Sequence, residues 1–490
     1  MISNVDRNKL SRQLVGLERF RRSAKCGANK NGIGTWKWVT GMGKTFAACL
    51  LVKKILRKQP KGEVIILVPR TVLKKQWKDT IKVICKGYEK NIKVMTVDYY
   101  LYHNLNLKPL LLIVDELHLF YTQRRIAIIS GKQCNYTFAL GLTGTFEEDA
   151  KRHHIVAQYL PIIDSVEEDE AIKEGWISDY VEFNLGYSLE EGERRIYDNY
   201  SNNIKEILGY FENTLNKKPF DMVTQCLSGF NGLKPFDIAC EFAESKGWYS
   251  NMPTDTTENV VIERDYNPNK VMRQAISLMK YVRSRKELLQ HSKSKVSIAL
   301  DIIKKFPNKK IITFSESTVF ADTLYRLTNK EISVLKGLQE TEQFSVRYHS
   351  NLETEIRKIK SKDVKYGKIR LKREALNKIE TGEVNVIHTA KALDVGFSVS
   401  DMEVSIITSS SSNSNQHTQR GGRVKRKSER GTVIIINVYA VATKDYDTLK
   451  SRQYKTPKRK VYWIDDIDLI GLGYVNNERE RLTNFINNYL

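Results

Sequence analysis

The stretch Thr40-Gly41-Met42-Gly43-Lys44-Thr45 decides the fold, and the segment Phe46–Lys54 after it has the composition of a helix. Glycines let a backbone turn tightly, so that its N–H groups point at phosphate oxygens. In such a loop the lysine ammonium reaches the β- and γ-phosphates, and the threonine hydroxyl binds Mg²⁺. Trp38 stands where the full GxxxxGK[ST] pattern has its first glycine, and we expect it to narrow the loop without removing phosphate binding. Residues 40–45 are therefore predicted to bind a nucleotide.

A pair of carboxylates follows the loop in the sequence. The apolar run Leu110–Val114 ends in Asp115-Glu116-Leu117-His118, and a carboxylate at the end of a buried parallel strand lies where ligands bind in open α/β sheets. Asp115 is predicted to hold Mg²⁺ together with Thr45, and Glu116 to orient or deprotonate an attacking water. His118 either couples this site to a second domain or packs against its own helix.

Short apolar runs alternate with longer amphipathic stretches in two regions of the chain. This pattern predicts an α/β protein with two parallel sheets that helices cover on both faces. The predicted domains are 1–187, a mainly helical accessory region 188–286, and 287–490 with a basic C-terminal extension. Residues 251–269 are expected to form a loop, with Pro253 and Pro268 as breakers. The remaining predicted strands are Val64–Val68, Phe138–Leu142, Ile311–Phe314, Val384–His388, Val404–Thr408 and Val433–Ile436.

The charge of the chain points to a polyanionic partner. Its 80 Lys+Arg against 57 Asp+Glu leave a net charge of +23, which attracts phosphate backbones but also membrane surfaces and acidic proteins. The 6 cysteines form no CxxC pair, which argues against a zinc ribbon and a disulfide framework. A membrane-spanning helix needs roughly 20 apolar residues, far more than any run here. The N-terminus also lacks an apolar signal core, so we expect a soluble intracellular protein without a membrane partner.

Beyond these two elements, further motifs resemble those of the superfamily-2 helicases, in the DExH group. They follow the family's order and span residues 10–430. Single matches of this kind are weak, whereas the ordered set is specific. The segments that resemble motifs Ia, Ib, III, IV, V and VI are, in turn, Val68-Pro69-Arg70 with Leu73, Gln76 and Trp77; Thr96 with Asp98-Tyr99; Thr143-Gly144-Thr145; Ile312–Ser315; Thr389–Phe397; and Gln419–Arg426.

The resemblance implies two RecA-like domains that use ATP and Mg²⁺. In the family the second and third arginines of motif VI reach the nucleotide from the second domain, and here these are Arg423 and Arg426. A guanidinium fork suits a transferring phosphoryl group, whose negative charge spreads over several oxygens. Thr143 and Thr145 would then couple hydrolysis to domain closure. The residues expected to contact the nucleotide also include Gly396, Gln419, and, as an adenine-recognising motif, Arg12 and Gln13.

The resemblance further places a nucleic-acid strand across motifs Ia, Ib, IV and V. Arg70, Thr96 and Thr389 are the residues expected near its phosphates, because hydroxyls and cations contact a backbone without selecting a sequence. Ser398 stands where many relatives carry an acidic residue, which weakens the expected nucleotide contact of motif V. Two basic clusters, 357–373 and 455–460, either grip nucleic acid or form solvated faces.

Together these features predict an ATP hydrolase that is an ATP-dependent DNA helicase or translocase. Single-stranded or branched DNA is the favoured substrate, because the chain is similar to phage branch-migration helicases that remodel forks and junctions in recombination and repair. The cytoplasm of a bacterial or phage-infected cell is the expected location. Two alternatives remain open: an RNA helicase of the DExH group, and the motor subunit of a restriction or defence complex that acts with a partner protein.

Overall fold

The structure is a computed structural model that divides into two compact units. The first unit comprises residues 1–186 and 298–490, and the second comprises Tyr187–Ser297. Arg423, Arg426, Gln419, Gly396 and Thr145 lie outside the described residues, as do Ser398 and most of the predicted loop 251–269. The structure describes residues 4–23, 32–144, 151–212, 218–246, 268–335, 343–359, 362–390, 402–409, 432–455 and 460–471.

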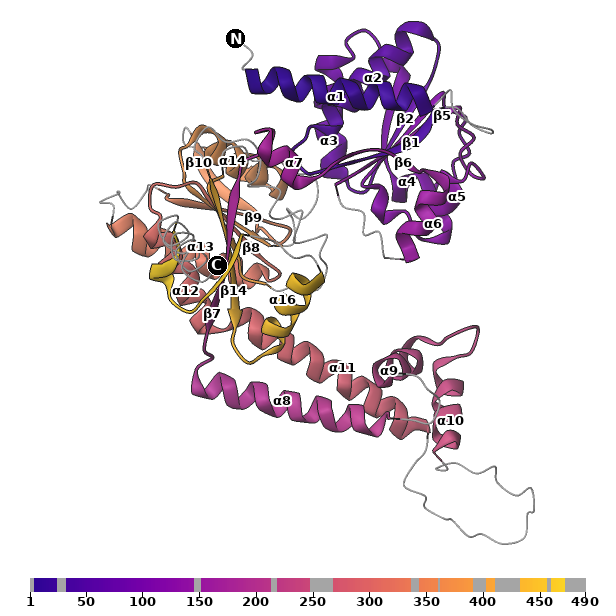
Figure 1. The fold of residues 1–490 in the computed structure, drawn as a ribbon. Helices are drawn as coiled ribbons and strands as arrows, with labels where there is room; N and C mark the ends of the chain where they lie inside the picture. The colour runs from indigo at the N-terminus through magenta and orange to yellow at the C-terminus, as the bar shows by residue number, and fades with distance from the viewer. Residues whose placement is uncertain are drawn as a thin grey trace, which may run out of the picture. The chain divides into compact units, whose positions relative to one another are not determined.

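The first unit contains a six-stranded sheet whose order is β3-β2-β4-β5-β1-β6. All of its strand pairs are parallel. Helices α2 (Lys44–Lys58) and α3 (Thr71–Ile84) form two of its crossovers (Figure 1). The strands are β1 Ile33–Trp38, β2 Val64–Val68, β3 Ile92–Thr96, β4 Leu111–Asp115, β5 Phe138–Thr143 and β6 Ile162–Val166.

Both faces of this sheet are covered by apolar side chains. One face packs against α1 (Asn4–Ser23), α2 and α3, and the other against the short helices α4, α5 and α6. Alternate residues of β2 enter the two clusters, as the two-residue period of a strand requires. Strands buried on both faces are continuously apolar, which is why the runs could be recognised in the sequence. The short helices are α4 Val97–Tyr102, α5 Gln123–Ile129, α6 Lys151–Tyr159 and α7 Glu168–Lys173.

The same unit contains a seven-stranded sheet in the order β15-β7-β14-β13-β8-β12-β9. Its helices are α12 Lys293–Lys305, α13 Thr318–Leu335, α14 Lys368–Thr381 and α16 Lys444–Lys455. A separate antiparallel hairpin joins β10 Glu355–Ile359 to β11 Lys362–Tyr366. The predicted α/β class with two RecA-like parallel-sheet domains is therefore confirmed. The seven strands are β7 Tyr180–Tyr187, β8 Ile311–Ser315, β9 Ser345–His349, β12 Val386–Ala390, β13 Val404–Ile407, β14 Val433–Ala440 and β15 Val461–Ile464.

Strand β7 corrects the predicted end of the first domain. Residues 180–187 were assigned to that domain, but β7 lies between β14 and β15 of the second sheet. The buried Asn437 amide of β14 donates to Glu182 Oε1 at 2.7 Å and to Asn184 Oδ1 at 2.8 Å. A strand's pairing partner depends on these distant contacts, so the local pattern of residues 180–187 could not assign it to a sheet.

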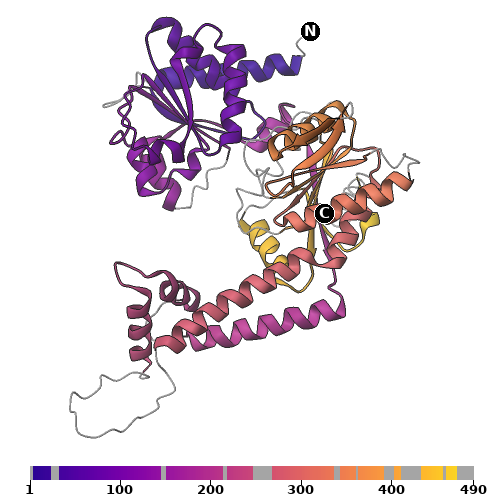
Figure 2. The same ribbon diagram turned by 180° about the vertical axis from the view of Figure 1, so that it is seen from behind.

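The second unit is helical. It ends at residue 297, about ten residues beyond the predicted end of the region 188–286. Two long helices, α8 (Glu191–Tyr210) and α11 (Pro268–His291), run side by side (Figures 1 and 2). The shorter helices α9 (Pro219–Ser228) and α10 (Pro235–Ser245) pack on one end of this pair around a shared apolar core. The prediction of a mainly helical region between the two sheet domains in sequence is confirmed.

Within the described part of the chain, no helix combines the length and apolar character that crossing a membrane requires.

Candidate nucleotide site

The loop before α2 has the backbone that the glycine pattern predicts. Gly41 and Gly43 adopt positive φ angles of 97° and 84°, a region that side chains other than glycine rarely enter. Gly43 is the N-cap of α2, and the helix begins at Lys44. The first N–H groups of a helix have no intrahelical partner and its N-terminus is electropositive, so this loop and helix start form an anion site.

Three strand ends bring the loop next to the carboxylates. In register, Asp115 of β4 lies opposite Leu142 of β5, and Thr143 of β5 lies opposite Lys37 of β1. A Cβ atom added to Gly144 would lie 3.0 Å from Thr40 Oγ1 and 3.2 Å from Lys44 Nζ. Gly144, which follows β5, thus lies against the phosphate loop. Because it has no side chain, it leaves room for the side chain of Lys44. The Lys44 ammonium donates to the Trp38 carbonyl oxygen at 2.8 Å.

Asp115 is buried at the end of β4 and held by two donors. The Trp77 indole N–H of α3 donates to Oδ2 at 2.8 Å, and the Glu116 N–H donates to Oδ1 at 3.1 Å. Burial raises the pKa of Asp115 and the charge of Glu116 raises it further, whereas the Trp77 hydrogen bond and the Lys44 charge oppose both effects. Trp77 was recognised only as part of motif Ia, and its contact with Asp115 required the packing of α3 on the sheet.

Glu116, His118 and Thr143 form a connected chain. Glu116 has a left-handed backbone (φ 52°, ψ 53°), which is uncommon for residues with a side chain and is often found at functional sites. His118 Nδ1 lies 3.1 Å from Thr143 Oγ1 and 3.5 Å from Glu116 Oε2. His118 is buried, and it connects the predicted catalytic carboxylate to the predicted coupling threonine. Both contacts of His118 lie within the first sheet domain, and its coupling to a second domain stays a prediction.

Helix α1 contacts the phosphate loop from the side. The Gln13 amide donates to the Met42 carbonyl oxygen at 2.8 Å, and Lys9 Nζ donates to the Gly41 carbonyl oxygen at 2.8 Å. A Cβ atom on Gly43 would lie 2.6 Å from Gln13 Nε2. Gln13, predicted to recognise adenine, is therefore bound to the loop itself.

Arg12 and Trp38 meet at a buried carboxylate, Asp164 of β6. Arg12 binds Asp164 through two nitrogens at 2.9 and 3.0 Å, and the Trp38 indole N–H donates to Asp164 Oδ2 at 2.8 Å. Arg19 adds a third contact to the same carboxylate. Trp38 is fully buried and stacks on Trp36, with ring centroids 4.6 Å apart.

This arrangement corrects one expectation. Trp38 does not narrow the loop, because its side chain points into the core beneath it. Arg12 forms an ion pair with Asp164 between α1 and β6, and its contact with a nucleotide stays a prediction. Neither contact could be recognised from the motif, because Asp164 was not a candidate residue.

The residues predicted to contact nucleic acid differ in exposure. Arg70 is exposed at the N-cap of α3, and the partly exposed Thr96 hydroxyl accepts the Tyr99 N–H at 3.2 Å and caps α4. Thr389 of β12 is 1% exposed and donates to the Thr313 carbonyl oxygen at 2.7 Å. The Thr389 hydroxyl is thus turned into the second sheet, and its contact with nucleic acid stays a prediction.

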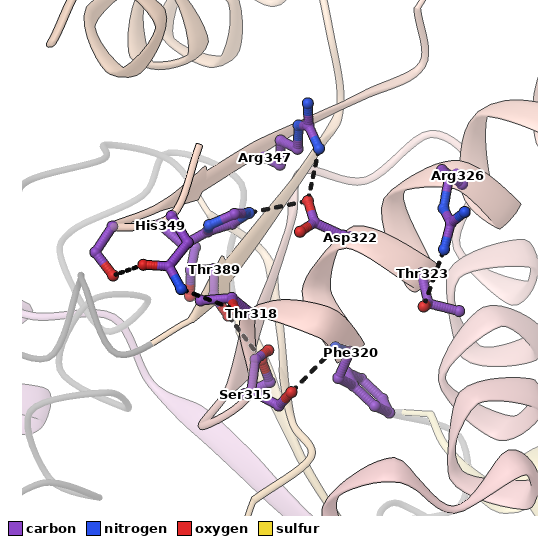
Figure 3. Close-up of polar contacts among 12 residues, drawn as sticks. Ser315, Thr318, Phe320, Asp322, Thr323, Arg326, Arg347, His349 and Thr389 are labelled. Carbon is purple, nitrogen blue, oxygen red and sulfur yellow. Dashed lines mark hydrogen bonds and ion pairs between the residues drawn. The ribbon is translucent and has the colours of Figure 1, made fainter. Parts of the chain in front are cut away.

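Polar side chains also gather at the carboxyl end of β9, near the start of α13 (Figure 3). Arg347 Nη1 and His349 Nε2 lie 2.7 and 3.0 Å from the same oxygen of Asp322, and His349 is buried. Burial lowers the pKa of His349, and Asp322 opposes that shift. Thr318, the first residue of α13, keeps part of its side chain exposed at this edge.

The residues present fit a Mg²⁺–nucleotide complex. Asp115, which ends β4, and Thr45, the second residue of α2, would supply the carboxylate and hydroxyl oxygens that Mg²⁺ prefers. Glycine at position 144 leaves room for the Lys44 ammonium group, because a Cβ atom there would lie 3.2 Å from Nζ. When bound, Mg²⁺ would neutralise charge on the phosphate oxygens.

Comparisons with known proteins match two parts of the chain to family models and most of its length to one relative. Residues 8–99 match the model of the type III restriction enzyme res subunit, and residues 294–428 match the helicase conserved C-terminal domain. The chain is 23% identical over 430 residues to the DNA 3'-5' translocase XPB2 of Sulfurisphaera tokodaii, which covers 84% of this chain and 79% of that protein.

Two solved structures match over most of this chain. The helicase Lhr of Mycobacterium smegmatis, bound to single-stranded DNA and AMP-PNP, matches with a TM-score of 0.50 at 11% identity, over 93% of this chain and 50% of that one. The Hef helicase domain of Pyrococcus furiosus matches with a TM-score of 0.48 at 15% identity, over 91% and 99%. The two family models match in the order of the motifs, and together with the translocase they support the resemblance to superfamily-2 helicases.

Proposed function

We propose that this protein is an ATP-dependent DNA motor of the superfamily-2 helicase type that moves along or remodels DNA. The observation that carries the proposal is the cluster at the carboxyl edge of the first sheet. There Lys44 of the phosphate loop lies beside Gly144, while Asp115 ends β4, the strand next to β5, and Glu116 follows it. A cation, a buried carboxylate and a second carboxylate beside a histidine suit phosphate binding, Mg²⁺ binding and the positioning of a water.

Each residue has a role in this proposal. Lys44 leaves the Trp38 carbonyl and binds the β- and γ-phosphates, and Thr45 and Asp115 would hold Mg²⁺. Glu116 orients the attacking water and accepts its proton, so that ATP and water become ADP and phosphate. When Glu116 accepts the proton, His118 and Thr143 transmit this change to the backbone at Gly144, which lies against the phosphate loop. Arg423 and Arg426, by the family resemblance, complete the site and make hydrolysis depend on domain closure.

DNA is the proposed substrate for two reasons. The net charge of +23 favours a phosphate backbone, and the relative matched over most of the chain is by name a DNA translocase. Branched DNA remains the favoured form, with Arg70, Thr96 and, in place of Thr389, Thr318 as phosphate contacts. The match to a restriction-enzyme subunit supports a second candidate, a motor that acts within a defence complex.

The first test is the steady-state ATPase rate without nucleic acid and with single-stranded, duplex, forked and four-way DNA, and with RNA. Glu116→Gln serves as the blank. Stimulation greatest on forked or four-way DNA supports the proposal. Stimulation by RNA alone rejects the substrate, and a rate that no nucleic acid changes favours the partner-dependent motor.

A further inference from the structure

Three aromatic rings lie together on the exposed side of α4, the short helix that follows β3. The ring centroid of His103 is 4.3 Å from that of Tyr99 and 5.1 Å from that of Tyr102. Tyr99 is 52% exposed and Tyr102 is 85% exposed, and His103 is exposed as well. Because both tyrosines contact the same histidine, the three rings form one continuous surface, which we call the α4 aromatic surface.

The opposite side of α4 is fixed in the core of the first sheet domain. Val97 and Tyr100 are buried in the apolar cluster on that face of the sheet, and the Tyr100 hydroxyl donates to the Gln133 carbonyl oxygen at 3.0 Å. At the start of the helix the Thr96 hydroxyl accepts the Tyr99 N–H at 3.2 Å. Core packing and this cap thus hold α4 in place, and the exposed rings remain accessible to a partner.

The α4 aromatic surface lies next to residues that are expected to contact phosphates. Val68 of β2 lies opposite Thr96 of β3 in register, so Arg70 and α4 follow neighbouring strand ends at the carboxyl edge of the first sheet. Helix α4 also packs against α5, which begins with Gln123-Arg124 (Figure 1). Exposed cations therefore stand on two elements that adjoin α4, because both Arg70 and Arg124 are exposed.

Charge favours a nucleic acid over a protein as the partner of these rings. The carboxylate of α4, Asp98, is paired with Arg125 of α5 at 3.3 Å. By contrast, Arg70 and Arg124 form no ion pair with any carboxylate of the described residues, which leaves positive charge on both neighbouring elements. Aromatic rings combined with such cations are typical of sites for single-stranded nucleic acid, because the cations attract the backbone while the rings stack on bases.

We propose that the α4 aromatic surface stacks on unpaired bases of the nucleic-acid strand that the motor follows. Arg70 and Thr96 are expected to contact the phosphates alone, whereas Tyr99, Tyr102 and His103 bind the bases. Every base has a π face, so this contact suits any sequence, but it requires bases that are not already stacked within a duplex. The inference rests on the proposed function and adds a preference for single-stranded segments to it.

The test measures, by fluorescence anisotropy, the affinity of the full-length protein for labelled oligo(dT) and for an abasic strand of the same length. The abasic strand keeps the phosphates and lacks the bases. Wild type should bind oligo(dT) about tenfold more tightly than the abasic strand. Tyr99→Ala/Tyr102→Ala should lose most of this difference and keep the wild-type affinity for the abasic strand.

Two control variants separate stacking from other effects. Tyr99→Phe/Tyr102→Phe keeps both rings and should retain the preference for oligo(dT). Phe220→Ala, which removes a 45% exposed ring of the helical unit, should bind both strands as the wild type does. Circular dichroism and the ATPase rate without nucleic acid should be unchanged in all variants.

Three results would overturn the proposal. The first is equal binding of oligo(dT) and the abasic strand by the wild type, or binding of neither. The second is an equal loss of affinity for both strands in the alanine variant, which would assign the tyrosines to the phosphates. The third is loss of the preference in the phenylalanine variant. The motor proposal fails on a different measurement, an ATPase rate that no nucleic acid changes, and base-dependent binding would survive that result.

Discussion

The carboxyl edges of the two parallel sheets present different chemistry. The first sheet ends beside the titratable groups Lys44, Asp115 and Glu116, of which Asp115 is buried. The second ends in Thr389, which is buried, and in His349 and Arg347, which share Asp322. Two sheets of one architecture therefore serve different tasks, because function depends on the side chains at the edge. The first edge carries the candidate reactive groups, whereas on the second Asp322 occupies Arg347 and one nitrogen of His349, and within the described residues the buried His349 Nδ1 has no hydrogen-bond partner.

The largest effect is expected at the first edge. Glu116→Gln removes the base while keeping the size of the side chain, so kcat for ATP should fall by about 10²–10⁴-fold with ATP binding retained. Lys44→Ala should lose ATP binding instead. A time course of phosphate release measures kcat, and binding of a fluorescent nucleotide measures ATP affinity. The variant Glu380→Gln, at an exposed residue, is the control. If Glu116→Gln hydrolysed ATP at the wild-type rate, Glu116 would not be the catalytic base, and the proposed difference between the two sheet edges would be rejected.

The second edge should respond to pH through stability. His388 is fully buried beside Thr313, and burial lowers its pKa to about 3. Above about pH 6.5 the folded and unfolded chains both keep this histidine neutral, whereas below that pH only the unfolded chain takes up the proton. The free energy of unfolding should then fall by up to about 1.4 kcal/mol per pH unit.

Urea unfolding between pH 7 and pH 5 measures this loss, and His388→Gln should flatten it. An unchanged slope in His388→Gln would show that another group titrates.

A smaller effect is expected from the support under the phosphate loop. Trp38→Phe keeps the ring but removes the N–H that binds the buried Asp164, so KM for ATP should rise by about three- to tenfold with kcat little changed. Trp36→Phe is the matched control, because within the structure described the buried Trp36 indole N–H has no hydrogen-bond partner. Similar KM values in the two variants would mean that the contact with Asp164 does not position the loop.

The smallest effect separates two threonines of the second sheet domain. Thr318→Ala should weaken single-stranded DNA binding by about threefold, because its side chain is partly exposed at the start of α13. Thr389→Ala should leave that affinity unchanged and cost about 1 kcal/mol of stability, since its hydroxyl bonds the Thr313 carbonyl inside the sheet. Fluorescence anisotropy and thermal unfolding distinguish the two, and the reverse result would restore Thr389 as the phosphate contact.

Much of the nucleotide site could be predicted because its signals are local. The glycines around Lys44 specify a turn and a helix start, and Asp115 ends an apolar strand that is recognisable by its own residues. The same holds for the two-sheet class, since strands buried on both faces are continuously apolar. The roles of Arg423 and Arg426 stay predictions, because these residues lie outside the described part of the chain.

The remaining features were decided by tertiary structure. Strand β7 pairs within the second sheet, where Asn437 binds Glu182. The Trp38 indole N–H donates to Asp164, and the packing of α1 places the Gln13 amide on the phosphate loop. Thr389 matched its motif and was still turned inward. Sequence by itself determined which segments are strands and which side chains can do chemistry, because periodicity and turn residues act over a few neighbours. Only the tertiary structure decided which side chains are in contact. Those contacts join residues far apart in the chain, and the environment of each side chain is set by its distant neighbours.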